Sequence, residues 1–151
     1  VDYEYPGGIH AMSMCRQADG CSVRVEEVIQ GTTGRAVSSS GRARLEGGSE
    51  WIFADDNPNP YLAEHQNLHA SIRGDGPHLN EAGRIAESTL TAIMGRMAAY
   101  SGQDITWEDA LQSGQDLRPA AYAFGPVPTP EIPRPGDTST DDPLWPSTIE
   151  R

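Results

Sequence analysis

Residues 59–74, NPYLAEHQNLHASIRG, decide how the rest of the sequence is interpreted. Asn59 can cap a helix whose first position is Pro60, where a missing backbone N–H costs nothing. Apolar or ring-bearing side chains then recur at helical spacing, at Tyr61, His65, Leu68 and Ile72. Gly74 is a typical helix stop. The stretch therefore predicts an amphipathic helix that ends before Gly74.

Two more helices are predicted downstream. Asn80 can cap the first of them, and Gly102 can end it. Its apolar stripe is Ala86, Leu90, Ile93, Met94 and Met97. Thr106 and Asp109 have the spacing of a capping box, which predicts a short helix over residues 107–112.

Upstream, residues 1–53 favour β-structure. The sequence VDYEY at residues 1–5 alternates apolar and acidic side chains, as a half-buried strand does. Further strand-like segments are separated by turn signals and lie at residues 9–17, 21–30, 35–38, 42–46 and 50–53. We therefore expect an α+β fold, with one open, mainly antiparallel sheet and helices on one of its faces.

The last part of the chain has a different composition. Eight of the twelve prolines follow residue 116, which favours extended backbone with few hydrogen-bond donors. Apolar side chains are interleaved with them, at Tyr122, Phe124, Val127, Ile132 and Trp145. We predict a globular part at residues 1–116 and an extended strap over its apolar surface at residues 117–151; a disordered tail is the alternative.

The charge restricts the possible partners. The chain has 22 acidic and 11 basic residues, a formal net charge of −11, and every basic residue is arginine. Phosphates would be repelled, which argues against nucleic acid and anionic membranes as partners. No apolar run approaches the roughly 20 residues of a membrane-spanning helix. The sequence starts at Val1 in a strand-like stretch, so we expect a piece of a longer polypeptide; nothing in it indicates a compartment.

Two small clusters could carry chemistry. Cys15 and Cys21 flank a turn, and we expect them to be buried structural residues on neighbouring strands; a redox pair or half of a metal site are the alternatives. His65 and His69 are four residues apart, a spacing that can ligate zinc. No glutamate stands between them to complete the HExxH pattern, so we expect no metal site.

Known catalytic motifs are missing from the sequence. It contains no GxGxxG, no P-loop and no GxSxG motif. The carboxylates are scattered, and no pair is placed by spacing for acid–base work. The residues alone therefore indicate no reaction, and no cofactor-binding residue is expected in this chain.

Four segments, taken in order, resemble a known family. They are VDYEYPGGIHAMSMCRQADGC at residues 1–21, GTTGRA at residues 31–36, residues 59–113, and LRPAAYAFGPVPTPEIPRPG at residues 117–136. Together they resemble the C-terminal domain of the Gfo/Idh/MocA oxidoreductases, bacterial dehydrogenases of sugars and cyclitols. Residues 137–151 have no counterpart in this resemblance.

The resemblance implies a domain of a larger enzyme. In that family an N-terminal Rossmann domain binds NAD or NADP, while the C-terminal domain helps to bind the sugar or cyclitol substrate and mediates association of subunits. This chain lacks the Rossmann fingerprint. It also lacks the catalytic lysine of the family, because it contains no lysine at all. The catalytic histidine would precede its first strand. We therefore expect the chain to be inactive by itself.

The resemblance also suggests residues for a substrate site. Tyr61 matches a tyrosine that faces the substrate in some relatives, and His65 would lie on the same helix face. Arg16 and Gln17 belong to the matching segments and are candidates for the same site. The alternatives are a freestanding, non-enzymatic binding or assembly module and an NAD-dependent glycoside hydrolase of the same family.

The chain is expected to form a homo-oligomer through its sheet. Apolar residues occur in both alternating sets of residues 9–17, so one sheet face is left for another subunit. Met12 and Met14 are the predicted anchors of a two-fold dimer packed through the sheet face.

Overall fold

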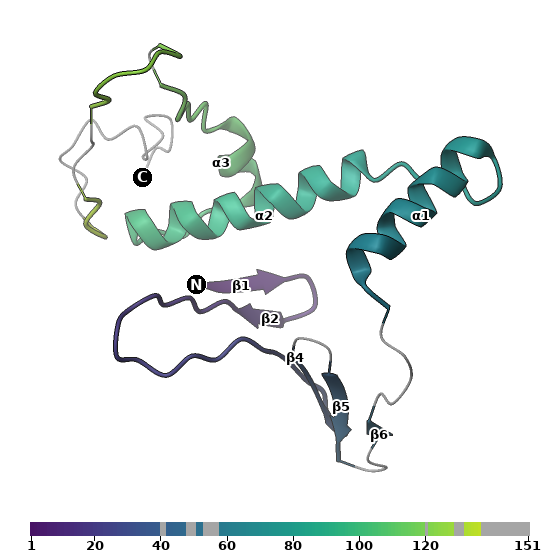
Figure 1. The fold of residues 1–151 in the computed structure, drawn as a ribbon. Coiled ribbons are helices and arrows are strands. Elements are labelled where there is room, and N and C mark those ends of the chain that lie inside the picture. The colour runs from purple at the N-terminus through teal and green to yellow at the C-terminus, as the bar shows by residue number, and fades with distance from the viewer. Residues whose placement is uncertain (40–41, 48–50, 53–57, 120, 129–131, 137–151) are drawn as a thin grey trace. The chain divides into compact units, whose positions relative to one another are not determined.

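A computed structural model describes residues 1–39, 42–47, 51–52, 58–119, 121–128 and 132–136. These residues form three helices and two antiparallel sheets, so the predicted α+β class is confirmed (Figure 1). The chain divides into two compact units. One unit consists of Val1–Cys15 and Asn80–Arg151, and the other of Arg16–Leu79.

The first unit begins with a β-hairpin. Strands β1 (Asp2–Tyr5) and β2 (Ile9–Met12) pair antiparallel, with Tyr3 opposite Ala11 and Asp2 opposite Met12. The turn between them uses Gly7 and Gly8 in the left-handed region, at φ 85° and 71°. Because side chains alternate along a strand, Tyr3 and Ala11 share one face of the hairpin and Asp2 and Met12 share the other.

Helix α2 (Ala82–Ser101) contacts the tyrosine face of this hairpin. The Tyr3 hydroxyl donates a hydrogen bond to the carbonyl oxygen of Thr91 at 3.1 Å. One helical turn further on, Gly95 is buried, and a Cβ atom there would lie 1.8 Å from the Tyr3 hydroxyl oxygen. The tyrosine therefore occupies the space that any larger residue at this helix position would need.

Local capping sets the ends of α2 and α3. Helix α2 has Glu81 as its N-cap residue, and Asn80 Oδ1 accepts a hydrogen bond from the Ala82 N–H at 3.3 Å. Gly102 ends α2 in the left-handed region, as predicted. Helix α3 (Trp107–Gln112) begins with the predicted capping box, in which the side chains and backbone N–H groups of Thr106 and Asp109 bond reciprocally.

The capping box makes α3 sensitive to acid. The hydrogen bonds from Thr106 hold the pKa of Asp109 below its ordinary value. A depressed folded-state pKa stabilises the fold above the unfolded-state pKa, and this contribution disappears as the pH falls through the folded-state value. We therefore expect the α3 amide signals to shift towards unfolded values below about pH 4, as measured by NMR. In Asp109→Asn this acid transition should be lost, whereas in the control Glu108→Gln it should persist; an identical titration in all three proteins would contradict the prediction.

The second unit contains a four-stranded sheet in the order β3-β4-β5-β6. Its strands are β3 (Glu27–Gln30), β4 (Arg35–Ser39), β5 (Arg42–Glu46) and β6 (Trp51–Ile52). The β3–β4 turn is closed by the Gly31 N–H, which donates to the Gly34 carbonyl oxygen at 2.9 Å. Val37, in the middle of β4, is the buried hydrophobic residue of this unit among the described residues.

Helix α1 (Pro60–Arg73) also belongs to the second unit and has the predicted boundaries. Asn59 Oδ1 accepts a hydrogen bond from the Tyr61 N–H at 3.0 Å, and Pro60 opens the helix. Gly74 follows in the left-handed region, at φ 78°. None of the residues of α1 is buried, although Ala63, Ala70 and Ser71 are partly covered.

Two predictions about the β-region are wrong. A single meander was expected, but the strands form two separate sheets, β1-β2 and β3-β4-β5-β6. Strands were expected at residues 9–17 and 21–30, but β2 ends at Met12 and β3 begins at Glu27. Residues 13–17 and 21–26, on either side of the predicted turn at residues 18–20, are compatible with strands. A strand also needs a hydrogen-bonded neighbour, and β1 and β4 are only four and five residues long.

The predicted proline strap is not shown by the structure. Among its described residues, Tyr122, Phe124, Val127 and Ile132 are exposed. One contact ties the end of the described segment to α2, because the Gly136 N–H donates to the Ser101 carbonyl oxygen at 2.8 Å. Trp145 and the rest of residues 137–151 lie outside the described residues.

Candidate functional site

One face of the four-stranded sheet carries a row of apolar side chains beside the polar pair Glu27 and Ser38. The register places Ile29 opposite Ala36, Ala36 opposite Leu45, and Leu45 opposite Trp51. Directly opposed residues share a face, so these four residues form one line across all four strands, here named the apolar row. Ile29 is 71% exposed, Leu45 45% and Trp51 49%. Neighbouring large apolar side chains with this exposure are typical of an interaction surface.

A shallow, open hollow of about 310 Å³ lies where the apolar row meets the β3–β4 turn. Ile29, Ala36 and Leu45 line it, together with Arg35, Glu46 and the glycines of the turns. The backbone approaches closely here, since a Cβ atom on Gly34 would lie 2.9 Å from the Glu46 carbonyl oxygen. A hollow of this size is at the lower limit for small-molecule sites.

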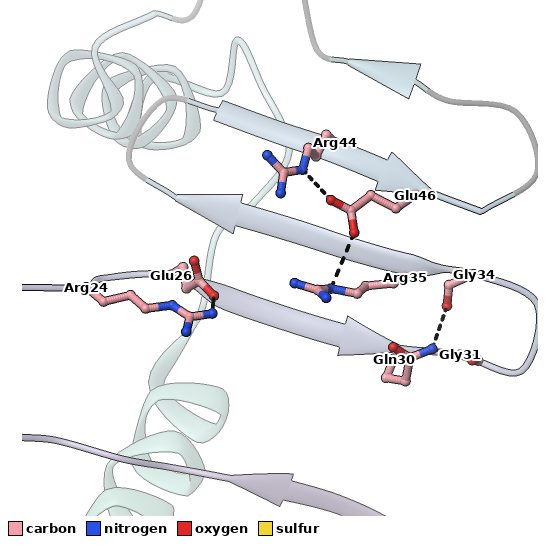
Figure 2. A network of polar contacts seen from close by, with 8 residues as sticks. All are labelled: Arg24, Glu26, Gln30, Gly31, Gly34, Arg35, Arg44 and Glu46. Atoms are coloured by element: carbon pink, nitrogen blue, oxygen red, sulfur yellow. Dashed lines mark hydrogen bonds and ion pairs between the residues drawn. The ribbon is translucent and has the colours of Figure 1, made fainter.

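The opposite face carries charged side chains on β4 and β5, which Figure 2 shows as Arg35, Arg44 and Glu46. Glu46 lies between two arginines: Arg44 Nε donates to its Oε1 at 2.7 Å, and Arg35 Nε lies 3.6 Å from its Oε2. The Arg35 Nε atom is enclosed and has no hydrogen-bond acceptor among the described residues. At 3.6 Å its contact with Glu46 is therefore an ion pair and not a hydrogen bond.

Arg24 and Glu26 form a second ion pair, immediately before β3 (Figure 2). The hydrogen bond from Arg24 is the main reason that the pKa of Glu26 is lowered, and the charges of Arg35 and Arg44 add to it. Pairs as exposed as these contribute little to stability.

Tyr61 and His65 lie one turn apart on α1, and both are exposed. His65 Nδ1 is 2.6 Å from the Tyr61 carbonyl oxygen. A carbonyl can only accept, so Nδ1 carries a proton; in the neutral ring Nε2 is then an acceptor, and in the charged ring both nitrogens donate. The helix therefore presents a phenol hydroxyl and an imidazole nitrogen, two groups that can hydrogen-bond to the hydroxyls of a sugar.

The structure does not bring the other two candidates to α1. Arg16 and Gln17 lie in the segment between β2 and β3 and are exposed. The Arg16 guanidinium donates to the Ser22 carbonyl oxygen at 3.0 Å, which ties together the two sides of the turn at residues 19–20. Its contacts with described residues are thus internal to this segment.

The expectation of buried cysteines is wrong. Cys15 and Cys21 are free thiols, and both are exposed, because the segment that carries them does not join either sheet. Among the described residues no three potential metal-ligating side chains gather, and this includes the surroundings of His65 and His69. In the same parts of the chain, no helix combines the length and apolar character needed to cross a membrane.

The apolar row was missed in the sequence because it depends on strand pairing. The alternation of each strand shows which residues share a face, but not which strands are neighbours. The sequence pointed instead to Met12 and Met14. In the structure Met12 shares its face with Asp2, Glu4 and His10, and Met14 lies beyond the end of β2.

Comparisons with protein-family models, with curated proteins and with solved structures found no match for this chain.

Proposed function

We propose that this chain is the substrate-binding and subunit-association domain of an NAD(P)-dependent oxidoreductase of sugars or cyclitols. The nicotinamide cofactor and the hydride-transfer residues belong to another part of the enzyme. The proposal rests on the ordered resemblance of residues 1–136 to the C-terminal domain of the Gfo/Idh/MocA family.

The observation that carries the association part is the exposed apolar row. Ile29, Leu45 and Trp51 occupy one line on one face of an antiparallel sheet. An antiparallel sheet tolerates water on one face when that face is polar. The opposite face carries the charged side chains Arg35, Arg44 and Glu46 around the buried Val37, so we expect the apolar row to be the face that a second subunit covers.

The exposed groups on α1 support the substrate part. The Tyr61 hydroxyl can donate and accept a hydrogen bond, and His65 Nε2 can accept one. Sugars and cyclitols carry several hydroxyl groups around a ring. Each hydroxyl can donate and accept a hydrogen bond, so the phenol and the imidazole can both bind it. Neither group is an acid or base placed against a nucleophile, which agrees with a role in binding and not in the chemical step.

Removing these groups is expected to weaken substrate binding alone. In the enzyme expressed from the complete reading frame, Tyr61→Phe and His65→Ala should each raise KM for the polyol about fivefold, since one net hydrogen bond is worth about 1 kcal/mol. The kcat value and the KM for NAD or NADP should stay within about twofold. Steady-state kinetics that follow NAD(P)H absorbance measure all three quantities.

The matched control is His69→Ala, the same substitution one turn further along α1. It should leave every constant unchanged. An equal rise in KM for His69→Ala would show that the effect is on the helix and not on a substrate contact. A complete reading frame without a GxGxxG domain, or without dehydrogenase activity on a panel of polyols, would contradict the proposal.

A further inference from the structure

Residues 21–26 have the pattern of a strand but lack a neighbour. Together with β3 they read CSVRVEEVIQ, in which residues 21–26 alternate and only Glu27–Gln30 is paired. In the part of the chain that the structure describes, residues 21–26 lie outside both ladders. Their alternate apolar side chains are exposed, Val23 at 91% and Val25 at 76%.

The position of this segment leaves a pairing edge open. Strand β3 is at the edge of the four-stranded sheet, so its side away from β4 has no strand beside it among the described residues. Residues 21–26 continue this edge. An unpaired edge of this length, with neither proline nor lysine in it, is a template for adding another strand.

The sequence around Val25 is complementary to itself in the antiparallel direction. Two antiparallel copies related by a two-fold axis must place one residue opposite itself. If that residue is Val25, Arg24 of each copy faces Glu26 of the other, and the two Val25 side chains meet. Opposite charges directly across a strand pair are stabilising, and each such pair occurs twice in the dimer.

We propose that residues 21–29 of two copies of this chain pair as antiparallel strands about a two-fold axis at Val25. Arg24 and Glu26 exchange their present contact within one chain for the same contact between chains. The two four-stranded sheets then join into one continuous sheet. The axis is perpendicular to the sheet, so the apolar rows of both copies lie on the same side.

The charges exclude the neighbouring registers. Centring the pair on Arg24 opposes two guanidinium groups, and centring it on Glu26 opposes two carboxylates; both arrangements are destabilising. Centring it on Val23 places Arg24 opposite Ser22, without a compensating charge. Electrostatics therefore select Val25, which gives the proposal a specific and testable register.

This edge pairing differs from association through the apolar row, and it does not depend on the proposed enzymatic role. Association through the apolar row would bury the face of the sheet, whereas edge pairing would form hydrogen bonds along the edge of the sheet. Changes at Arg24 or Glu26 affect the edge without touching the row. The two surfaces can therefore be tested separately in one chain.

Charge reversal tests the register. Arg24→Glu and Glu26→Arg each place two like-charged pairs across the axis and should raise the dimer dissociation constant about tenfold or more, as measured by sedimentation equilibrium. The double variant Arg24→Glu/Glu26→Arg restores both opposite-charge pairs and should return to within about threefold of the unmodified protein. Arg84→Glu, on the exposed surface of α2, is the control and should have no effect.

Cross-linking tests the axis directly. In a Cys15→Ser/Cys21→Ser background, Val25→Cys should form a disulfide-linked dimer on mild oxidation, because facing residues of antiparallel strands have Cα atoms about 4.5–5.5 Å apart. Val23→Cys is the matched control: each such cysteine lies opposite Glu27 and about 13 Å from its own counterpart, so it should not cross-link.

Three results would overturn the proposal. The first is an unmodified protein that remains a monomer at tens of micromolar. This result counts against the proposal even if residues 21–26 are paired, because their partner strand would then belong to the same chain. The second is a dimer that does not respond to the charge reversals; this would assign association to the apolar row and leave the proposed function intact. The third is equal cross-linking of Val23→Cys and Val25→Cys.

Discussion

The Gly95→Ala substitution is expected to destabilise the protein by about 1–3 kcal/mol, the usual cost of overpacking. In an open helix the same substitution stabilises by up to about 1 kcal/mol, because alanine is the better helix former. At Gly95, however, a Cβ atom would lie 1.8 Å from the Tyr3 hydroxyl oxygen and 2.9 Å from its Cζ atom. No carbon fits at these distances, so the tyrosine ring must move.

Moving the ring also breaks a hydrogen bond. The Tyr3 hydroxyl donates to the Thr91 carbonyl oxygen at 3.1 Å, and this contact joins two segments that are 88 residues apart in sequence. The β1–β2 hairpin contacts α2 through this tyrosine. We therefore expect Gly95→Ala to lower the midpoint of chemical denaturation and to shift the NMR signals of β1 and β2 while α2 stays helical.

Gly83→Ala provides the matched control for this prediction. It makes the same change in the same helix, but nothing lies within 4 Å of a Cβ atom at Gly83. This variant should keep or raise the denaturation midpoint. If Gly95→Ala also raised it, the close contact between Tyr3 and Gly95 would be disproved.

The helices could be predicted from the sequence because their ends are determined locally. Asn59 with Pro60, and Thr106 with Asp109, act on backbone groups within three residues of themselves. Glycine stops at the ends of α1 and α2 act in the same way. The one-residue error at the start of α2, where Glu81 and not Asn80 is the cap residue, is within the usual fraying of helix ends.

The sheets could be predicted only in part, because pairing is not local. The strand signals correctly indicated strands at residues 2–5, 35–39 and 42–46. The strand signals also extended over residues 14–17 and 21–26, which lie outside both ladders. The same sequence signal was thus right or wrong according to the length of a partner strand elsewhere in the chain.

The candidate site shows the same limit. The proximity of Tyr61 and His65 follows from their spacing on a helix and could be predicted. The apolar row needs the register of four strands, and the contact between Tyr3 and Gly95 needs the docking of a hairpin on a helix. Neither of these is encoded in the spacing of nearby residues.

The largest change in assembly is expected from Leu45→Glu. Leu45 is at the centre of the apolar row, opposite Ala36 on one side and Trp51 on the other. A carboxylate buried there without a partner would lose its hydration, and loss of a central anchor of an interface typically costs 2 kcal/mol or more. The dissociation constant for packing through the sheet face should therefore rise about 30-fold or more.

Met12→Glu separates this prediction from the one that the sequence alone suggests. Met12 is as exposed as the residues of the row, but it shares its face with Asp2, Glu4 and His10 and faces no apolar neighbour across β1. A glutamate there enters a face that is already polar, so the assembly should not change. Light scattering over a concentration series should show that Leu45→Glu halves the particle mass and that Met12→Glu leaves it unchanged. The reverse outcome would place the interface on the hairpin, and an unmodified protein with the 16.3 kDa mass of one chain would show that the apolar row is not an interface between copies.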